Sequence, residues 1–371
     1  MTEFAQDTVK PNADNPAAPS VLHWLPAAFL LAVVGLGAVA TVASPGFREG
    51  HPGKDIIKGE WMLAWEKNLD AKVPWRDPSV NLWGGANYRL FNEARDGALV
   101  GKNGWLFTTE EYQTAAGDAA EIRNKVRYIT QVRDELAKDG AKLVVALIPA
   151  KSRVYADELR AVQPAQWRPV YNQMRAALTG AGIPTPDLAT AFAQARRPGQ
   201  NLFLHTDTHW TPRGAQVAAE TLAQAVRGTG TGLPAASYTA KVKPEISRAG
   251  DLLRYVPVGR GGPQPDFVSE PEYTRTDEGD GGLLGDETLT VTLVGTSYSA
   301  ETKDNVWHFG GALSQALGSE VLNAAQEGKG PIVPMREYLK SHDRQDNPPQ
   351  VVVWEIPERF LRVNYPEGSG K

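Results

Sequence analysis

The 371-residue sequence contains no cysteine, which excludes thiol catalysis, disulfide bonds and metal sites with cysteine ligands. This absence assigns no compartment, because an exported chain can also avoid thiols that an oxidising environment would cross-link. The sequence has no basic block and no phosphate-binding glycine loop, and 39 Lys and Arg against 43 Asp and Glu give a net charge of −4. We therefore expect neither a nucleic-acid partner nor a cofactor.

One long apolar run stands near the N-terminus. Residues 25–43 carry no charge, and a helix of that length spans a hydrocarbon layer about 30 Å thick. We expect an N-terminal tail at residues 1–20 and an uncleaved transmembrane anchor at residues 21–43, because the preceding region is long and not cationic. A cleaved signal peptide ending near Thr41 and Ala43 is one alternative, and a buried core helix is the other.

Charge on either side of the apolar run bears on its orientation. Cationic residues favour the cytoplasmic side of a membrane span. Here Lys10 alone precedes the run, whereas three cations follow it, namely Arg48, Lys54 and Lys58. Loop charge therefore mildly opposes an exported C-terminal body.

The remaining chain divides into two parts by composition. Residues 44–118 form an aromatic, glycine-rich lead-in, and residues 119–371 form the main domain. In the lead-in, turn residues 101–104 separate two apolar triplets, which predicts a short hairpin over residues 98–107. The aromatic lead-in is also a candidate interaction surface.

The main domain alternates strands with helices. The patterns predict strands at residues 142–148, 185–188, 289–294, 321 and 351–354. They predict helices at residues 118–138 with Asp118 as N-cap, 166–178, 212–226 with Thr211 as N-cap, 304–317 and 336–339. This alternation predicts an α/β fold with a mostly parallel sheet and helices on both faces. Residues 228–288 break the alternation and are expected to be a surface excursion.

A candidate nucleophile follows the predicted strand at residues 289–294. Gly295 and Thr296 lead into Ser297 and then into a predicted helix. Reactive groups of open parallel sheets collect beyond the carboxyl ends of strands, and N–H groups at a helix start can stabilise an oxyanion. The alternative role for this serine is ordinary helix capping.

A candidate base lies just before the predicted helix at residue 212. Serine is a weak nucleophile until a base takes its proton, and an imidazole oriented by a carboxylate is the usual base. Asp207 and His209 can supply that pair to Ser297. His205, Asp207 and His209 also alternate as possible zinc ligands, although a zinc site normally needs further ligands. For His205 we expect a packing or hydrogen-bonding role, and we predict no metal.

Six short segments occur in a characteristic order, at residues 101–107, 148–151 with Tyr155, 207–211, 250–252, 295–299 and 354–359. Together, over residues 85–365, they resemble motifs of the AlgX/AlgJ family of alginate O-acetyltransferases. The resemblance implies an SGNH-hydrolase-like domain with a permuted motif order, in which the Asp/His pair precedes the serine. It also implies exposure to the periplasm. The AlgX type carries a C-terminal carbohydrate-binding module, whereas this sequence ends soon after its last predicted strand, so we expect a closer similarity to the membrane-anchored AlgJ type.

The same resemblance implies roles for three residues. Ser297 is expected to be the nucleophile, His209 the general base and acid, and Asp207 the carboxylate that orients the imidazole. The acetyl donor is expected to be a membrane-bound O-acyltransferase, and the acceptor an acidic exopolysaccharide. Other exopolysaccharide biosynthesis proteins are the remaining expected partners.

Five further residues are candidates for substrate contacts. Trp210 and Tyr298 stand beside the expected triad, where aromatic rings can pack against sugar faces, although buried packing is the alternative for Trp210. Lys151, Arg254 and Arg359 lie in or beside motif segments and can meet uronate carboxylates. Their alternative role is that of surface or structural charges.

Taken with the apolar run, the resemblance implies a membrane-anchored O-acetyltransferase of the periplasmic face, acting on alginate or a similar acidic exopolysaccharide. An acetyl esterase with the same triad stays open, because water competes with the sugar as acceptor. A non-catalytic binding component of a secretion complex is the alternative from another class of protein.

Overall fold

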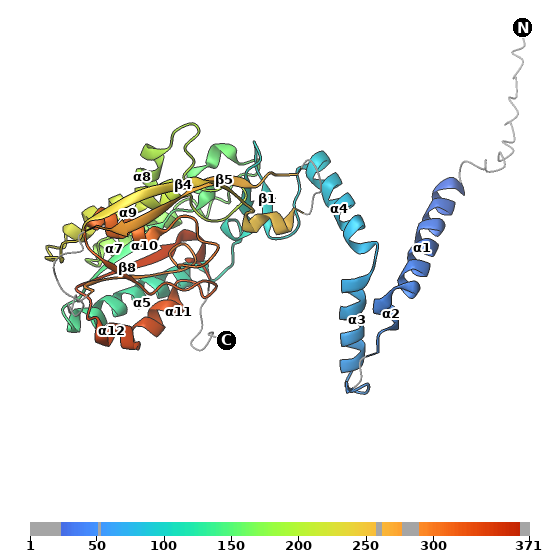
Figure 1. Ribbon diagram of the computed structural model, residues 1–371, viewed down its shortest axis with the longest axis horizontal. Coiled ribbons are helices and arrows are strands. Elements are labelled where there is room, and N and C mark those ends of the chain that lie inside the picture. The colour runs from blue at the N-terminus through green and yellow to red at the C-terminus, as the bar shows by residue number, and fades with distance from the viewer. Residues whose placement is uncertain (1–23, 51–52, 257–261, 277–288, 364–371) are drawn as a thin grey trace, which may run out of the picture. The chain divides into compact units, whose positions relative to one another are not determined.

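The computed structural model describes residues 24–50, 53–256, 262–276 and 289–363. The chain divides into two compact units, Met1–Trp83 and Gly84–Lys371 (Figure 1). The expected N-terminal tail lies outside the described residues.

The N-terminal unit is helical. It contains α1 (Leu25–Ala43), α2 (Pro45–Arg48), α3 (Glu60–Lys72) and the first part of α4 (Arg76–Ala86). Among the described residues, α1 is the one helix long and apolar enough to cross a membrane. None of its residues is buried, so α1 is not the core helix of this unit. The predicted apolar helix near the N-terminus is therefore present.

The C-terminal unit holds all eight strands of the described chain. Its strands are β1 (Ala98–Val100), β2 (Leu106–Thr108), β3 (Lys142–Ile148), β4 (Tyr238–Arg248), β5 (Asp266–Arg275), β6 (Val291–Val294), β7 (Val321–Asn323) and β8 (Val351–Pro357). Its helices are α5 (Asp118–Lys138), α6 (Lys151–Val154), α7 (Val170–Gly180), α8 (Leu188–Ala195), α9 (Pro212–Arg227), α10 (Phe309–Leu317), α11 (Ile332–Tyr338) and α12 (His342–Asp346).

Four strands form the central sheet in the order β3-β8-β6-β7, and every neighbouring pair is parallel. Strand β8 lies between β3 and β6, with Val145 opposite Trp354 and Val294 opposite that same tryptophan. The carboxyl ends of β3, β8 and β6 therefore meet at one edge of the sheet. The predicted parallel α/β architecture is confirmed.

Both faces of the sheet are covered, because successive side chains of a strand point to opposite sides. On one face Val144, Ala146 and Val353 pack in a core with α8, α9 and α10. On the other face Val145 and Trp354 pack in a core with α5, α7 and α11. Figure 1 shows α5 and α11 together on this side of β8.

The hairpin β1-β2 also belongs to the C-terminal unit. Its strands pair antiparallel, with Leu99 opposite Phe107, as the sequence predicts. Trp105 and Phe107 are buried in the same core as α9. The C-terminal unit and its main core therefore both begin before residue 119. The lead-in expected from composition is therefore shared between the two units.

A second two-stranded sheet lies within residues 228–288, where the sequence analysis predicted no strands. Strands β4 and β5 pair antiparallel, with Arg248 opposite Asp266 and a register shift between Val242 and Glu245. This ribbon packs against α9 and α10 instead of joining the central sheet. Residues 257–261 and 277–288 of the expected excursion lie outside the described residues.

Two local predictions are wrong. The strand predicted at residues 185–188 is absent, because Pro184 and Pro186 have no N–H to donate to a ladder, and α8 begins at Leu188. Asp118 is the first residue of α5 and not its N-cap; Gly117 takes the cap position, and the Asp118 carboxylate accepts the Ala115 N–H.

The start of α9 is fixed by a side-chain cap. Thr211 Oγ1 accepts the N–H of Gly214 at 3.1 Å and donates to the carbonyl of Asn201 at 2.6 Å, and Pro212 opens the helix. The predicted cap is confirmed. It fixes where the preceding loop, which carries His209, enters the helix.

We expect Thr211→Ala to lower the free energy of unfolding by about 1–2 kcal/mol, because the substitution removes the cap. The same substitution inside α9, Thr221→Ala, is a matched control and should change stability by roughly 0.5 kcal/mol or less. Urea unfolding of the full chain in detergent, followed by circular dichroism, measures both. Equal losses in the two variants would show that the cap does not stabilise this boundary.

Candidate active site

Ser297 stands in a tight turn just beyond the carboxyl end of β6. The N–H groups of Ser299 and Ala300 both donate to the carbonyl of Thr296. The predicted entry of Ser297 into a helix is wrong, because α10 begins only at Phe309. The Ser297 hydroxyl is thus presented by an isolated turn.

A buried carboxylate on the neighbouring strand holds this turn in place. Glu355 of β8 accepts the N–H of Thr296 at 2.7 Å and the hydroxyl of Ser299 at 3.1 Å. The close approach requires glycine at position 295, where a Cβ would lie 2.4 Å from Glu355 Oε2. Burial raises the pKa of Glu355 to about 7, although the hydrogen bonds from Thr296 and Ser299 act to lower it.

The loop before α9 carries the other two predicted triad residues. It folds back on itself, since Leu204 N–H donates to the carbonyl of His209 and Thr211 N–H donates to that of Leu202. Within it, Asp207 Oδ1 accepts the backbone N–H of His209 at 3.0 Å. The chain path therefore sets the imidazole against the carboxylate.

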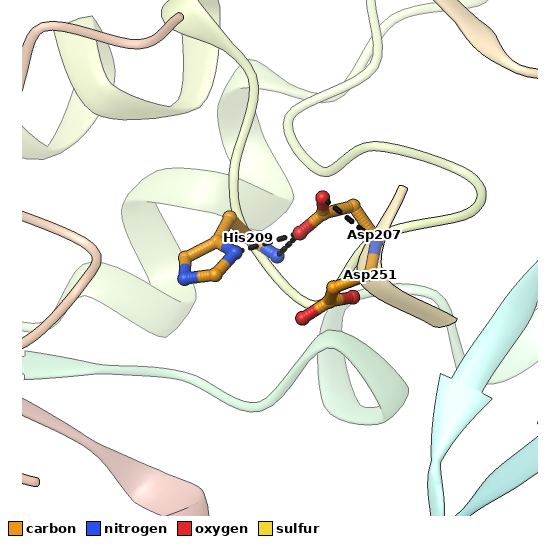
Figure 2. A group of neighbouring side chains, drawn as sticks. All are labelled: Asp207, His209 and Asp251. Carbon is orange, nitrogen blue, oxygen red and sulfur yellow. Dashed lines mark hydrogen bonds and ion pairs between the residues drawn. The ribbon is translucent and has the colours of Figure 1, made fainter. Parts of the chain in front are cut away.

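The structure brings the three predicted triad side chains together. His209 Nδ1 lies 2.6 Å from Asp207 Oδ1, and His209 Nε2 lies 2.8 Å from Ser297 Oγ, across 88 residues of sequence. Figure 2 shows the imidazole and the Asp207 carboxylate facing each other, with Asp251 beside them. Because the carboxylate accepts the Nδ1 proton, the Nε2 lone pair is left to accept the serine proton.

Asp207 is buried and its charge is compensated. Its second oxygen, Oδ2, accepts the N–H of Asp251 at 3.1 Å and Nη2 of Arg248 at 3.2 Å. Burial opposes ionisation, but the hydrogen bond from His209 and the charge of Arg248 lower the pKa of Asp207 well below its usual value. The carboxylate therefore stays ionised beside the imidazole.

Aromatic rings fix the plane of the imidazole. The ring of Trp307 stacks on His209 with centroids 4.6 Å apart and planes inclined by 10°. Tyr298 contacts the same imidazole at 4.7 Å, and its hydroxyl donates to the carbonyl of Thr208 at 2.5 Å. These contacts restrict rotation of His209 away from Ser297.

The side chains of Asp207, His209 and Asp251 also offer three possible metal ligands within 4.8 Å of one another. Their acceptor atoms already take protein hydrogen bonds, because the two oxygens of Asp251 accept the N–H and hydroxyl of Thr208. His205 does not converge with them, since its Nδ1 lies 3.1 Å from Asp266 Oδ1. The donor set fits a proton relay better than a metal site.

Three of the predicted contact residues are buried and offer no surface to a sugar. Trp210 is fully buried, and its Nε1–H donates to the carbonyl of Tyr298. Tyr298 is buried as well, with 2% of its surface exposed. Lys151 donates its ammonium protons to the carbonyls of Leu106, His205 and Asp207. Burial lowers the pKa of Lys151 to about 8. In the structure these residues support the active-site loops, and the sugar or carboxylate contacts expected of them stay predictions.

The other two predicted contact residues line a cavity. Arg254 is exposed and Arg359 is nearly buried, and both face a space of about 660 Å³ that Thr208 and Asp251 also line. A separate cavity of about 1050 Å³ lies against the ribbon and the start of α9 and includes His205. No residue of the triad lines either cavity, but the smaller one is bounded by Thr208 and by Asp251, whose N–H donates to Asp207. We therefore take the triad and the smaller cavity as the candidate site.

Sequence reasoning missed three supporting residues, Arg248, Asp251 and Glu355, as parts of the site. Asp251 and Glu355 stand inside the motif segments, which was a usable signal. Arg248 has no such signal, because it reaches Asp207 only through the unpredicted ribbon.

A family model described as an SGNH hydrolase-like domain of the acetyltransferase AlgX matches residues 98–358. The chain belongs to this family. A protein from Pseudomonas fluorescens named "Probable alginate O-acetylase AlgJ" is 37% identical over 91% of this chain and 86% of its own length. A protein of the same name from Azotobacter vinelandii is 39% identical over 84% of this chain and 81% of its own.

Solved structures of the AlgX/AlgJ family show the same fold. The O-acetyltransferase domain of Pseudomonas putida AlgJ is 36% identical, with a TM-score of 0.67, and the match covers 75% of this chain and 96% of that domain. AlgX of Pseudomonas aeruginosa, at 24% identity and a TM-score of 0.55, shares the fold over 73% of this chain and 68% of its own. The predicted family and the SGNH-like fold class are confirmed, and the C-terminal unit is an acetyltransferase domain of this family.

The raised pKa of Glu355 predicts a pH dependence of stability. Its ordinary value is 4.5 and its folded value is about 7, so the stabilising contribution is complete below pH 4.5 and is lost as the pH rises through 7. Glu355→Gln stays neutral and should not show this loss. Between pH 4.5 and 8 the wild type should lose roughly 3 kcal/mol more unfolding free energy than Glu355→Gln.

Urea unfolding of the full chain across this pH range measures the difference. Glu272→Gln, on the exposed part of β5, is the matched control and should keep the wild-type pH dependence. Parallel curves for the wild type and Glu355→Gln would contradict the prediction.

Proposed function

We propose that this protein transfers acetyl groups to hydroxyls of alginate or a similar acidic exopolysaccharide through an acetyl-Ser297 intermediate. The observation that carries the proposal is the 2.8 Å contact between Ser297 Oγ and His209 Nε2, with Asp207 behind the imidazole. The relatives named alginate O-acetylase supply the acceptor class.

In the first half-reaction, His209 Nε2 accepts the Ser297 proton while Oγ attacks the acetyl carbonyl of the donor. The imidazolium that forms is stabilised by the ionised Asp207 and by the stacked ring of Trp307. His209 then returns the proton to the leaving group, and acetyl-Ser297 remains.

In the second half-reaction, the same imidazole takes a proton from a sugar hydroxyl as its oxygen attacks the acetyl ester. His209 then gives this proton to Ser297 Oγ, which leaves as the free serine hydroxyl, and the acetyl group remains on the sugar. Water in the same position would give free acetate, so the difference between a transferase and an esterase depends on acceptor binding. The acceptor must therefore be held beside Ser297 in preference to water.

We also propose how the protein is attached to the membrane. We assign α1 as an uncleaved signal anchor that holds the acetyltransferase domain at the periplasmic face of the inner membrane; its unbroken apolar sequence and its exposed surface support this. A membrane-bound O-acyltransferase is the proposed donor of acetyl groups, and other exopolysaccharide biosynthesis proteins are the proposed neighbours. Residues 21–43 are the proposed anchor segment.

Substitution of the triad tests the proposal. We expect Ser297→Ala and His209→Ala each to reduce acetyl transfer by about 10³-fold or more, because each removes a reacting group. Asp207→Ala should leave more activity, because Asp207 orients the imidazole and does not react. Ser237→Ala, an exposed serine before β4, is the matched control.

Two measurements check these outcomes. Purified full chain receives a chromogenic acetyl ester with and without an alginate oligosaccharide, and acetyl content of the exopolysaccharide is measured in cells that carry each variant. Wild-type acetylation by Ser297→Ala would refute the catalytic assignment and favour a binding component. Acetyl released only as free acetate, whatever the acceptor, would favour an esterase. Equal thermal destabilisation in all three triad variants would show a structural role.

A further inference from the structure

The chain that follows α1 turns back toward it within the N-terminal unit. Helix α3 lies beside α2 (Figure 1), so close that a Cβ on Gly46 would lie 2.8 Å from the Cβ of Lys72. Trp65 Nε1 donates to the carbonyl of Phe47 at 3.0 Å, and the two rings are in contact. Phe47 thus meets the first half of α3 and Gly46 meets its last residue, so α3 carries the chain back toward α1.

Trp75, just beyond the end of α3, contacts the apolar helix itself. Its Nε1–H donates to Thr41 Oγ1 at 3.2 Å, and a Cβ on Gly37 would lie 3.9 Å from the indole ring. Gly37 precedes Ala43, the last residue of α1, by six positions, which is about 9 Å along a helix axis. The indole is therefore level with the last turns of α1, and Trp75 is otherwise exposed.

The depth of this contact suits the boundary of a lipid bilayer. With α1 as the membrane span, its 19 residues cover about 28 Å, close to the thickness of the hydrocarbon layer. The Trp75 ring then lies within about 10 Å of the end of the span, in the region where tryptophan is enriched and interfacial helices bury their apolar side. Its one polar atom is already bonded to Thr41, so the ring enters this region without an unpaired donor.

The turn that carries Trp75 also has few unpaired polar groups, which are costly near hydrocarbon. The N–H of Arg76 donates to the carbonyl of Val73 at 3.2 Å, and Pro74 has no N–H to satisfy. Nη1 of Arg76 donates to Asp77 Oδ1 at 3.2 Å, so that the cation is compensated. The turn is therefore compatible with the headgroup region.

Two further large side chains continue this surface along α4. Leu82 and Trp83 expose 77% and 70% of their surface. They follow Trp75 by seven and eight residues, a spacing that places side chains on one side of a helix. Asp77 and Asn81 fall on the other side of α4 by the same spacing rule. The apolar side is thus continuous with the contact between Trp75 and α1.

We propose that residues 73–83 return to the membrane and lie in the headgroup region of the leaflet in which α1 ends, with Trp75, Leu82 and Trp83 directed into the lipid. The partner is the lipid surface itself, because the segment meets the anchor helix at that depth and its two charges, on Arg76 and Asp77, cancel. The assignment rests on the proposed anchor and adds a second membrane contact to it. In this arrangement the chain leaves the membrane after Trp83, at the end of the N-terminal unit, and not after α1.

Single cysteines test the assignment directly, because the sequence contains none. A nitroxide label is attached to Leu82→Cys, on the proposed lipid side, and to the matched control Asn81→Cys, about 100° around the helix. Each full-length variant is reconstituted into phosphatidylcholine vesicles without any other protein. Electron paramagnetic resonance measures collisions of the label with oxygen, which concentrates in lipid, and with a nickel chelate, which stays in water.

We expect the ratio of oxygen to nickel collisions to be at least about threefold higher at Leu82→Cys than at Asn81→Cys, as an interfacial helix requires. Equal ratios would overturn the proposal. A higher ratio at Leu82→Cys that arises only after a membrane-bound O-acyltransferase is added would also overturn it, since a protein and not lipid would then cover the surface.

A third label reports on the anchor alone. Val34→Cys lies in the middle of α1 and should show the highest ratio of the three. A high ratio at Val34→Cys with equal ratios at the other two positions would keep the anchor and refute the return of the chain. A water-exposed label at Val34→Cys would remove the anchor, and the proposed return with it.

Two tryptophan substitutions locate the contact. Trp75→Ala in the Leu82→Cys background should lower the ratio toward that of Asn81→Cys, because the ring that holds the segment to α1 is lost. Trp61→Ala is the matched control, since Trp61 stacks on Trp65 in the first half of α3. An unchanged ratio in Trp75→Ala, or an equal fall in the control, would contradict the assignment. If Trp75→Ala disturbs the helices in circular dichroism, Trp83→Ala, which removes an exposed ring, decides by the same criterion.

These measurements involve no acetyl transfer and are separate from the chemistry of Ser297. Labels that follow the predictions, together with wild-type acetylation by Ser297→Ala, would keep the membrane contact and remove the proposed catalysis. Loss of acetylation in Ser297→Ala, together with equal ratios at Leu82→Cys and Asn81→Cys, would do the reverse.

Discussion

The hydrogen bond between Asp207 and His209 is the interaction on which the site depends, because it determines which imidazole nitrogen faces Ser297. Two segments that are distant in the sequence maintain it. Arg248 at the end of β4 and the N–H of Asp251 just after it bind the Asp207 carboxylate, and Lys151 at the start of α6 donates to the carbonyl of Asp207. The geometry of one side-chain pair thus reflects the packing of the whole C-terminal unit.

Residues 354–359 show how one short segment can support a site without reacting. Trp354 donates to the carbonyl of Pro331, Glu355 holds the Ser297 turn, and Glu358 accepts the N–H of Ala150 and pairs with Arg153. Each contact joins β8 to a different loop at the carboxyl edge of the sheet. The segment therefore sets the relative positions of loops that the chain leaves far apart.

Much of this fold is predictable because its core strands are continuous apolar runs. The strand at residues 142–148 and the cap at Thr211 follow directly from such local signals. The ribbon was missed although apolar and polar residues alternate along β4, as in Lys241, Val242 and Lys243, because the surrounding region is rich in glycine, proline and acidic residues. Arg248 therefore cannot be predicted as a partner of Asp207 until the ribbon pairing is known. The helix predicted at Ser297 is absent because the Glu355 carboxylate, and not a helical hydrogen-bond pattern, holds the turn.

The buried ammonium of Lys151 has a consequence for an enzyme that handles activated acyl groups. A primary amine is a better nucleophile than a sugar alcohol and would form a stable amide. Lys151 gives its protons to three carbonyls and has 1% of its surface exposed, so its nitrogen lone pair is not available for attack. Lys151 thereby supports the loop that carries Asp207, while its amine is shielded from the acetyl-Ser297 ester proposed above.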